Sequence, residues 1–486
     1  MKNNELEFSW RPEKLHEECG VFGICDVDGI DCANVTYYGL YALQHRGQQS
    51  CGIAVNNDGN IICTKDMGLV NEVFNEKVLS HLEGQMAVGH VNYSKYSKAS
   101  AGYRESIQPI VRKYKKGTLT IAHNGSLVNA SELRDRFESD GAVFHGTSDA
   151  EVIAHVIAKE RISSASVEEA VNKMMKSIKG AFSMIVMSPQ KMIGCRDTYG
   201  IRPLSLGKLK NSYVLASETC AFDAIGAEFI RELEPGEIVV INKDKITSIK
   251  DNITDNHGLC VFEYMYFARP DSIIEGTSVY DARKKAGMVL AQEHPVEADL
   301  VFGVPDSGLC AAIGYSEESG IPYGYGLIKN RYIGRTFIQP TQSERQNLVK
   351  IKLNVLGDAV KGKRVVMVDD SIVRGTTIRD IVRLLKEAGA LEVHVRISSP
   401  PFKWPCYFGT DVPSKENLIA CQMELDEIAK AIEADSLGYL SIEGIKKMLP
   451  DRKCGWCQGC FTGEYPIEVP NKNDNENGRR IYTYER

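Results

Sequence analysis

The thirteen residues VVMVDDSIVRGTT, at positions 365–377, constrain the fold of this 486-residue chain more than any other segment. The first four residues are apolar and predict a short buried strand, and two carboxylates, Asp369 and Asp370, follow directly. A loop rich in small residues then leads into an amphipathic stretch, which predicts a helix with Thr377 and Asp380 as its capping box. A strand, a loop and a helix in this order are typical of a parallel α/β sheet.

The chemistry of this loop fits a phosphorylated sugar. The backbone N–H groups and the dipole of a helix N-terminus favour a phosphate. Asp369 and Asp370 cannot face that phosphate directly, but they suit the hydroxyl groups of a sugar or a Mg²⁺ ion. A phosphate with neighbouring hydroxyls describes a ribose 5-phosphate. Taken alone, the string also fits a loop with two solvated acids.

The two halves of the chain differ in pattern. The second half alternates buried strands with helices, as in ADLVFGVPDSG and EVHVRISSP, which predicts an α/β domain with a parallel sheet. The first half holds short strands and hairpins with helices in separate batches, which predicts a layered α+β domain. We expect domains at 19–252 and 253–470, with polar segments at 1–18 and 471–486.

Composition excludes several classes of protein. Hydrophobic residues make up 43% and charged residues 25%, as in an ordinary soluble globular protein. No apolar run approaches the ~18 residues of a membrane helix, and the N-terminus lacks the apolar segment of a secretory signal. The net charge of -6 argues against a general nucleic-acid binder. We therefore expect a cytoplasmic protein that binds neither nucleic acid nor membrane, with its 14 cysteines mostly reduced.

The string at 365–377 resembles the motif by which type I phosphoribosyltransferases bind 5-phosphoribosyl 1-diphosphate (PRPP). GVPDSG resembles their pyrophosphate loop, and KNRYIGRTFIQP resembles their flexible lid. The resemblance assigns the ribose hydroxyls to the two aspartates and the 5-phosphate to the loop that follows. The implied PRPP residues are Asp369, Asp370, Ser371, Arg374, Gly375, Thr376, Thr377, Lys329 and Arg331, and the implied Mg²⁺ residues are Ser307, Asp369 and Asp370.

Four strings in the first half, EECGVFGI, LQHRGQQS, HNGSLVN and GTSDAE, resemble the N-terminal-nucleophile glutamine amidotransferases. The resemblance implies an αββα domain and removal of a propeptide, residues 1–18, so that a terminal cysteine can use its own α-amine as the base. The implied roles are a nucleophile (Cys19), an oxyanion hole (Asn124 and the N–H of Gly125), a contact for the glutamine α-ammonium group (Asp149) and a supporting side chain (Arg46). By itself, Cys19 also fits a buried strand cysteine.

One position departs from that family. The chain reads GHVNY where the family usually reads GHVRY, so Asn92 replaces an arginine that pairs with the glutamine α-carboxylate. Asn92 is the implied glutamine-binding residue, but it brings no charge, and Lys95 or Arg104 is a candidate to supply one. The departure leaves open a weak glutaminase, an altered amide donor, or a synthase that uses free ammonia.

Four late cysteines combine a C-x-x-C pair with two distant members. They are Cys260, Cys406, Cys457 and Cys460. Such a set suits zinc or an iron–sulfur cluster, and chemistry alone does not choose between them. Cys454 and Cys457 form a competing pair in CGWC. The segments CVFEYMYFARPDS, SSPPFKWPCYFG and CQGCFTGEYP resemble one branch of the PRPP amidotransferases, which implies that the four cysteines hold a structural [4Fe–4S] cluster.

The two halves together resemble the PRPP amidotransferase family from about residue 17 to about residue 468. The resemblance implies glutamine-dependent amination of PRPP to 5-phosphoribosylamine, glutamate and pyrophosphate, the first committed step of purine synthesis. It also implies a homotetramer and feedback inhibition by purine nucleotides. Two alternatives stay open: a diverged enzyme that uses free ammonia, and a non-catalytic regulator that binds PRPP.

Overall fold

The computed structural model describes residues 19–93, 104–243, 245–330, 332, 353–410, 412, 414–449 and 455–470. They form two compact units. The first unit contains the described residues within 16–281, 406–411 and 451–486, and the second contains those within 282–405 and 412–450. The expected propeptide, 1–18, and the expected tail, 471–486, lie outside the described residues. The domain boundary expected after residue 252 stays a prediction.

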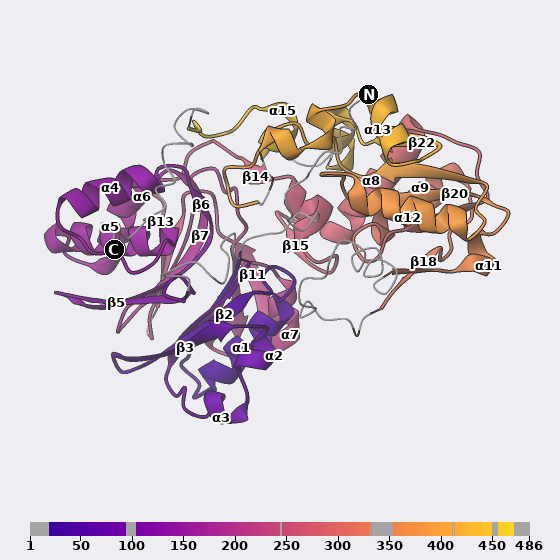
Figure 1. Cartoon of the computed structure of the whole chain (residues 1–486). Coiled ribbons are helices and arrows are strands. Elements are labelled where there is room, and N and C mark those ends of the chain that lie inside the picture. Colours follow the sequence, from indigo (N-terminus) through magenta and orange to yellow (C-terminus); the bar gives the residue numbers. More distant parts are fainter. Residues whose placement is uncertain are drawn as a thin grey trace, which may run out of the picture. The chain divides into compact units, whose positions relative to one another are not determined.

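The first unit contains two antiparallel sheets (Figure 1). The seven-stranded sheet has the order β11-β9-β10-β1-β4-β2-β3, and the six-stranded sheet has the order β13-β12-β8-β7-β6-β5. The strands of the first sheet are β1 (Cys19–Cys25), β2 (Ser50–Asn57), β3 (Asn60–Met67), β4 (Met86–Asn92), β9 (Ser205–Leu209), β10 (Ser212–Ala216) and β11 (Glu228–Glu232). Those of the second are β5 (Ile110–Tyr114), β6 (Gly117–Leu127), β7 (Gly180–Met187), β8 (Met192–Arg196), β12 (Ile238–Ile241) and β13 (Ile246–Ile249).

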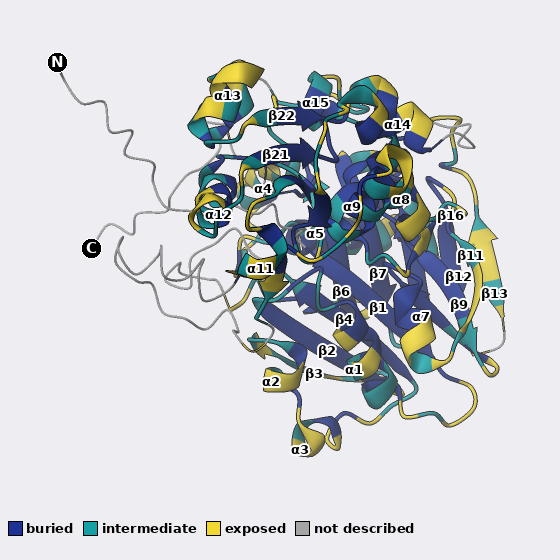
Figure 2. Ribbon diagram, turned by 90° about the vertical axis from the view of Figure 1, so that its right-hand side faces the viewer, coloured by how far each residue is buried: buried dark blue, intermediate teal, exposed yellow. Residues whose placement is uncertain are grey.

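The two sheets pack face to face. Val21 and Leu215 from one sheet and Ile185 from the other share a buried core between the sheets. Every residue of the central strand β1 is buried, so both faces of this strand are covered (Figure 2). A second core joins the six-stranded sheet to α4 (Ala130–Ser139), α5 (Asp149–Ser163) and α6 (Val167–Ser177). A third joins the other sheet to α1 (Cys32–Ala42), α2 (Val70–Val73), α3 (Glu76–Leu79) and α7 (Cys220–Ile225). The predicted αββα arrangement is confirmed.

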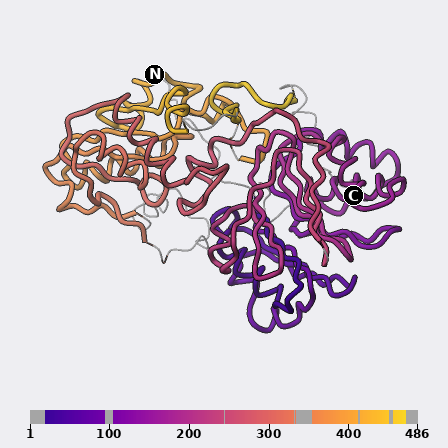
Figure 3. Tube along the Cα trace, turned by 180° about the vertical axis from the view of Figure 1, so that it is seen from behind, coloured from indigo at the N-terminus to yellow at the C-terminus, as the bar shows by residue number. Residues whose placement is uncertain are grey.

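Short elements complete the first unit. β14 (Leu259–Cys260) pairs in parallel with β23 (Trp456–Cys457), and a π-helical turn, η1 (Glu263–Phe267), follows β14. A two-stranded ribbon of β15 (Ile273–Ile274) and β16 (Thr277–Ser278) and the short helix α15 (Gly459–Thr462) are the remaining pieces. The tube in Figure 3 shows that chain segments far apart in sequence build this region.

The second unit is an α/β layer, as predicted. Its sheet has the order β17-β20-β21-β22, and all three pairings are parallel. The strands are β17 (Leu300–Gly303), β20 (Arg364–Asp369), β21 (Glu392–Ile397) and β22 (Ser436–Tyr439), and β18 (Leu327–Lys329) forms a separate hairpin with β19 (Leu353–Val355). The helices are α8 (Val279–Glu293), α9 (Leu309–Ser319), α11 (Gly357–Val360), α12 (Thr376–Glu387), α13 (Leu425–Ala431) and α14 (Ile442–Met448), with single 3-10 turns at 415–417 and 419–421. None of the described helices is long and apolar enough to cross a membrane.

The start of α12 differs from the prediction. The expected capping box of Thr377 and Asp380 is wrong, because the helix begins at Thr376 and its N-cap is Gly375, with no side-chain hydrogen bond at the cap. Gly375 has a φ of 85°, a left-handed conformation that glycine adopts at little cost. A glycine at this position lets the loop turn directly into the helix, so no side chain covers the cap.

Candidate functional site

Cys19 is the first residue of the central strand β1, where it is paired with the last residue of β4, Asn92. The Cys19 side chain is buried, and its thiol Sγ lies 3.3 Å from the Asn92 Oδ1, to which it donates a hydrogen bond. The Asn92 Nδ2 in turn lies 3.4 Å from the Ser50 Oγ in β2. Adjacent strands therefore place the predicted nucleophile and the predicted glutamine-binding residue side by side.

Arg46 lies beside this pair and is completely buried. Its Nε donates a hydrogen bond to the backbone carbonyl of Cys19 at 3.2 Å. Its other nitrogens form ion pairs with two buried carboxylates, Glu218 and Glu263. A buried arginine requires such partners, because an unpaired charge in the protein interior is costly. The structure thus places Arg46 against the backbone of the predicted nucleophile, and its supporting role stays a prediction.

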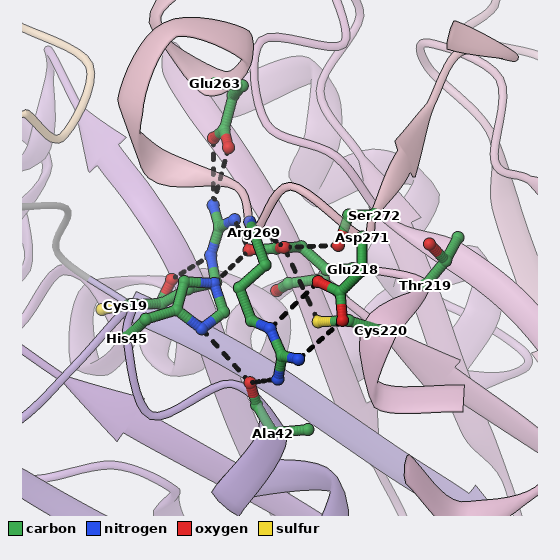
Figure 4. A network of polar contacts seen from close by, with 12 residues as sticks. Cys19, Ala42, His45, Glu218, Thr219, Cys220, Glu263, Arg269, Asp271 and Ser272 are labelled. Atoms are coloured by element: carbon green, nitrogen blue, oxygen red, sulfur yellow. Dashed lines mark hydrogen bonds and ion pairs between the residues drawn. The ribbon is translucent and has the colours of Figure 1, made fainter. Parts of the chain in front are cut away.

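Glu218 anchors the other side of this network. It accepts hydrogen bonds from His45 Nε2 at 2.7 Å, from Ser272 Oγ at 2.7 Å and from the Arg269 backbone N–H at 2.9 Å (Figure 4). Burial by itself would raise the pKa of Glu218, but His45 and Arg46 outweigh it and hold the pKa well below the ordinary value. Glu218 is therefore a permanent anion at neutral pH.

The predicted oxyanion-hole residues lie in β6 of the opposing sheet, which packs against β1. Asn124 is fully buried, and neither its Nδ2 nor its Oδ1 has a hydrogen-bond partner among the described residues. Gly125 has a φ of 129°, and a Cβ there would lie 2.1 Å from the carbonyl oxygen of Ala181. A buried amide without a partner costs free energy and is unusual in a native fold, so Asn124 is a candidate ligand-binding group.

Asp149 lies close to the same strand. It is the first residue of α5, which Ser148 caps, and its Oδ2 accepts hydrogen bonds from the Leu127 N–H at 2.8 Å and the Ser126 Oγ at 3.3 Å. The carboxylate is thus fixed at the end of β6, just beyond Gly125. Of the two candidate substitutes for the missing arginine, Arg104 is exposed and pairs with Asp66 at 3.6 Å, while Lys95 lies outside the described residues.

Two buried histidines flank the site residues in sequence, His90 before Asn92 and His123 before Asn124. Burial lowers the pKa of His90 to about 3 and that of His123 to about 4. Both imidazoles are therefore neutral at physiological pH. The His90 Nε2 contacts the His123 carbonyl oxygen at 3.0 Å, which links β4 with β6 across the two sheets.

In the second unit, Asp369 ends β20 and Asp370 follows it, at the edge of an open hollow lined by residues 369–375 with Thr377 and Ile378. Asp369 Oδ1 accepts hydrogen bonds from the Asp370 N–H at 2.9 Å and from the Ser307 Oγ at 3.3 Å. The parallel pairing of β17 with β20 explains this meeting, since the loops that follow both strands lie at the same sheet edge. The structure therefore brings together the three predicted Mg²⁺ residues.

The predicted lid is only partly described. Lys329 ends β18 and forms an ion pair with Asp306, in the loop that also holds Ser307, at 2.6 Å. Arg331 lies outside the described residues. Lys329 is thus placed at the predicted pyrophosphate loop, where its ammonium group can meet a polyanion.

The four late cysteines meet in the first unit. Cys260 and Cys457 are register partners in the parallel pair of β14 and β23, Cys460 lies in α15, and Cys406 accepts a hydrogen bond from the Phe408 N–H at 3.4 Å. Burial raises the pKa of Cys457 to about 12 and that of Cys260 and Cys460 well above the ordinary value, and the charges of the neighbouring cysteines add to the effect. Within the described residues, no disulfide engages them.

The chemistry of four cysteine sulfurs suits a zinc ion or an iron–sulfur cluster. Among the described side chains, no three His, Cys, Asp or Glu lie close enough together to hold one metal ion. A zinc ion holds all four sulfurs at about 2.3 Å. A four-iron cluster spreads them, because each thiolate binds a different iron. Cys260 and Cys457 are buried and Cys406 and Cys460 are partly buried, and a metal ion or a cluster would bind all four as thiolates.

Sequence reasoning missed two members of the first site, Glu218 and Glu263. Each is the only charged residue in its segment, ASETCAF and FEYMYF, where the other side chains are apolar, aromatic or small hydroxyls. A lone carboxylate in such a run must be exposed or paired, so its position was a signal of a buried ion pair.

Comparison with known proteins identifies a domain family in each half of the chain. Residues 97–224 match a glutamine amidotransferase domain, and residues 277–398 match a phosphoribosyl transferase domain. The amidophosphoribosyltransferase of Bacillus subtilis is 48% identical over 460 residues, 94% of this chain and 95% of that protein. The chain belongs to the amidophosphoribosyltransferase family. The family member of Archaeoglobus fulgidus is 48% identical over 93% of this chain and 99% of that protein.

Solved structures of the family have the same architecture. The glutamine PRPP amidotransferase of B. subtilis complexed with ADP and GMP superimposes with a TM-score of 0.87 at 47% identity, over 93% of this chain and 98% of that one. A structure described as the allosteric regulatory enzyme of purine biosynthesis gives a TM-score of 0.87 at 48% identity, over 93% of this chain and 97% of that one. The amidophosphoribosyltransferase fold therefore accounts for both units.

Proposed function

We propose that this chain catalyses the glutamine-dependent amination of PRPP to 5-phosphoribosylamine, glutamate and pyrophosphate, the first committed step of purine synthesis. The observation that carries the proposal is the placement of Cys19. It begins a central strand, contacts Asn92 and is held through its carbonyl by Arg46, in a chain whose second unit has a phosphate loop. Neither the placement of Cys19 nor the proposed phosphate loop alone requires an aminating enzyme. A site that releases ammonia from glutamine and a site that binds an activated ribose phosphate would, however, carry out two steps of one reaction.

In the first unit, we propose that removal of residues 1–18 frees the α-amine of Cys19 as the base. The thiolate attacks the glutamine amide carbon, and the developing oxyanion accepts hydrogen bonds from Asn124 Nδ2 and the Gly125 N–H. The unpartnered Asn124 side chain supports this role. Asp149 pairs with the α-ammonium group and Asn92 with the α-carboxylate. Ammonia leaves, and water then releases glutamate from the thioester.

In the second unit, the carboxylates of Asp369 and Asp370 bind the ribose hydroxyls. The backbone of the loop and the N-terminus of α12 bind the 5-phosphate, which the uncapped helix start supports. The residues proposed for the phosphate are Ser371, Arg374, Gly375, Thr376 and Thr377, with Lys329 and Arg331 on the pyrophosphate. Ser307, Asp369 and Asp370 would hold Mg²⁺, whose charge offsets that of the leaving pyrophosphate, with water and substrate as its other ligands.

Further properties belong to the same proposal. Cys260, Cys406, Cys457 and Cys460 would hold a [4Fe–4S] cluster, which cross-links three chain segments. We also propose a cytoplasmic homotetramer with domains at 19–252 and 253–470. Inhibition by purine nucleotides is supported by the ADP and GMP bound to the B. subtilis relative.

A second candidate function is amination with free ammonia. The observation that favours it is Asn92, which accepts a hydrogen bond from the nucleophile and offers no charge to a glutamine carboxylate. A third, a non-catalytic regulator that binds PRPP, has less support, because the chain keeps Cys19, Asn124 and Asp149, which binding of PRPP alone would not require.

The test compares PRPP amination with glutamine and with ammonium chloride, for the wild type and for Cys19→Ala. Glutamine-dependent turnover that is lost in Cys19→Ala, with the ammonia rate retained, supports the main proposal. Turnover with ammonia alone would establish the second candidate, and no turnover with either would establish the third. The intact mass of the purified protein reports whether residues 1–18 are removed.

A further inference from the structure

We propose that Glu263 is a positioning residue that holds the nucleophile Cys19 and the oxyanion-hole residue Gly125 through one buried chain of ion pairs. The inference rests on the glutaminase function proposed above. It gives a role to a carboxylate that neither the sequence motifs nor the proposed mechanism uses. All residues of this chain of contacts belong to the first unit.

The first branch runs from Glu263 to the nucleophile. Glu263 Oε1 and Oε2 accept hydrogen bonds from Arg46 Nη2 at 3.0 and 3.1 Å, and both side chains are fully buried. Arg46 Nε then contacts the Cys19 carbonyl oxygen at 3.2 Å. Once the propeptide is removed, no preceding residue restrains Cys19, so the contact at its carbonyl and the hydrogen bond from its thiol to Asn92 gain importance. Glu263 thus orients the arginine that orients the nucleophile.

The second branch runs from the same carboxylate to the segment 408–410. Arg202 Nη1 pairs with Glu263 Oε1 at 3.0 Å, and this arginine is also buried. Its Nη2 donates to the Phe408 carbonyl oxygen at 3.0 Å and to the Thr410 Oγ1 at 3.3 Å. Arg202 therefore fixes the backbone on both sides of Gly409.

Gly409 lies directly against Gly125. A Cβ added to Gly409 would lie 3.2 Å from both the Cα and the carbonyl carbon of Gly125, and 3.0 Å from Arg202 Nη2. Gly409 also has a φ of 112°, which favours glycine. The segment that Arg202 holds is thus packed on the residue whose N–H is proposed to stabilise the oxyanion. Its position limits where that N–H can point.

One carboxylate therefore serves both halves of the site. The distance between a nucleophile and its oxyanion donors must be correct to a fraction of an ångström, and these two groups lie in opposing sheets. A buried ion pair is suited to this task, because its charge-assisted hydrogen bonds are directional and unscreened by water. Replacing Glu263 with a neutral residue should let both arginines shift and should misalign both groups.

The experiment compares Glu263→Gln with a matched control, Glu237→Gln. Glu237 is also fully buried in the first unit and pairs with an arginine, Arg231, but its described contacts are with Ser248 and the Glu234 N–H. We expect Glu263→Gln to lower kcat with glutamine at least about tenfold, which is ~1.4 kcal/mol of transition-state stabilisation, while the rate with ammonium chloride stays within about twofold. The control should keep both rates within about twofold.

Two further measurements separate positioning from stability. Alkylation of Cys19 by iodoacetamide reports the nucleophile alone, and binding of glutamate γ-semialdehyde, which forms a hemithioacetal, also reports the oxyanion hole. We expect Glu263→Gln to slow alkylation and to weaken aldehyde binding at least about tenfold. The proposal is overturned if Glu263→Gln and Glu237→Gln lose glutamine activity and ammonia activity to the same extent. It is also overturned if Glu263→Gln binds the aldehyde as tightly as the wild type.

A second pair of variants tests the Gly409 contact if Glu263→Gln does not fold. Gly409→Ala should weaken aldehyde binding and leave alkylation of Cys19 unchanged, since it disturbs only the Gly125 branch. Gly141→Ala is its control, because Gly141 has a φ of 88° and open space around its Cβ. Equal behaviour of the two variants refutes the contact. If wild-type glutamine turnover is absent or survives Cys19→Ala, the glutaminase function itself fails, and that result is distinct from either outcome.

Discussion

Replacing Asn124 with leucine should make the protein more stable and much less active with glutamine. Asn124 is fully buried in β6, and its amide nitrogen and oxygen both have no partner among the described residues. An unsatisfied buried polar group costs about 1–3 kcal/mol, and leucine has a similar shape without polar atoms. We therefore expect Asn124→Leu to raise the free energy of unfolding by about 1–3 kcal/mol.

The same change should remove one donor from the proposed oxyanion hole. Loss of one such donor costs about 10²–10³-fold in kcat, or about 2.7–4 kcal/mol of transition-state stabilisation. The rate with ammonium chloride should not change, because that reaction does not need the oxyanion hole. The assays are calorimetric unfolding and PRPP amination with each nitrogen source.

Thr120→Val is the matched control. Thr120 lies in the same strand, is equally buried and has an unpartnered Oγ1. It should gain stability without losing glutamine activity. The reasoning is refuted if Asn124→Leu is destabilised by more than about 1 kcal/mol, or if it keeps wild-type kcat with glutamine.

Three other predictions concern pH, PRPP and iron. The free energy of unfolding should fall as pH drops from about 6.5 to about 4, by up to ~1.4 kcal/mol per pH unit for each of His90 and His123. The folded imidazoles have pKa values of about 3 and about 4 and stay neutral in this range, whereas the unfolded state takes up protons. Calorimetry of His90→Gln should give a shallower slope, and an unchanged slope contradicts the assignment. Asp369→Asn should reduce kcat/KM for PRPP by about 10–150-fold and leave glutamine hydrolysis intact, as separate assays of the two half-reactions would reveal. Cys457→Ser should lower the bound iron and sulfide of the purified protein, whereas Cys421→Ser, at an exposed cysteine outside the cluster, should not.

Much of the local structure of this protein, and the chemistry of its candidate sites, could be predicted from short sequence motifs. The string at 365–377 predicted a strand, an acidic loop and a helix, and the structure has β20, which ends at Asp369, then Asp370 and then α12. Patterns of this kind are readable because each depends on residues adjacent in the chain. The predicted capping box was wrong because the helix begins at Thr376, directly after Gly375 in its left-handed conformation, and so earlier than the side-chain pattern places it.

Only the tertiary structure decided which distant residues meet. Cys19 and Asn92 are 73 positions apart and become neighbours through the pairing of β1 with β4. Glu263 joins Arg46 and Arg202 although no motif links the three, because burial of each charge requires a partner and only the packed fold shows which one is available. The residue types in the sequence fixed the possible chemistry, and the register of the strands and the pairing of buried charges fixed where that chemistry is assembled.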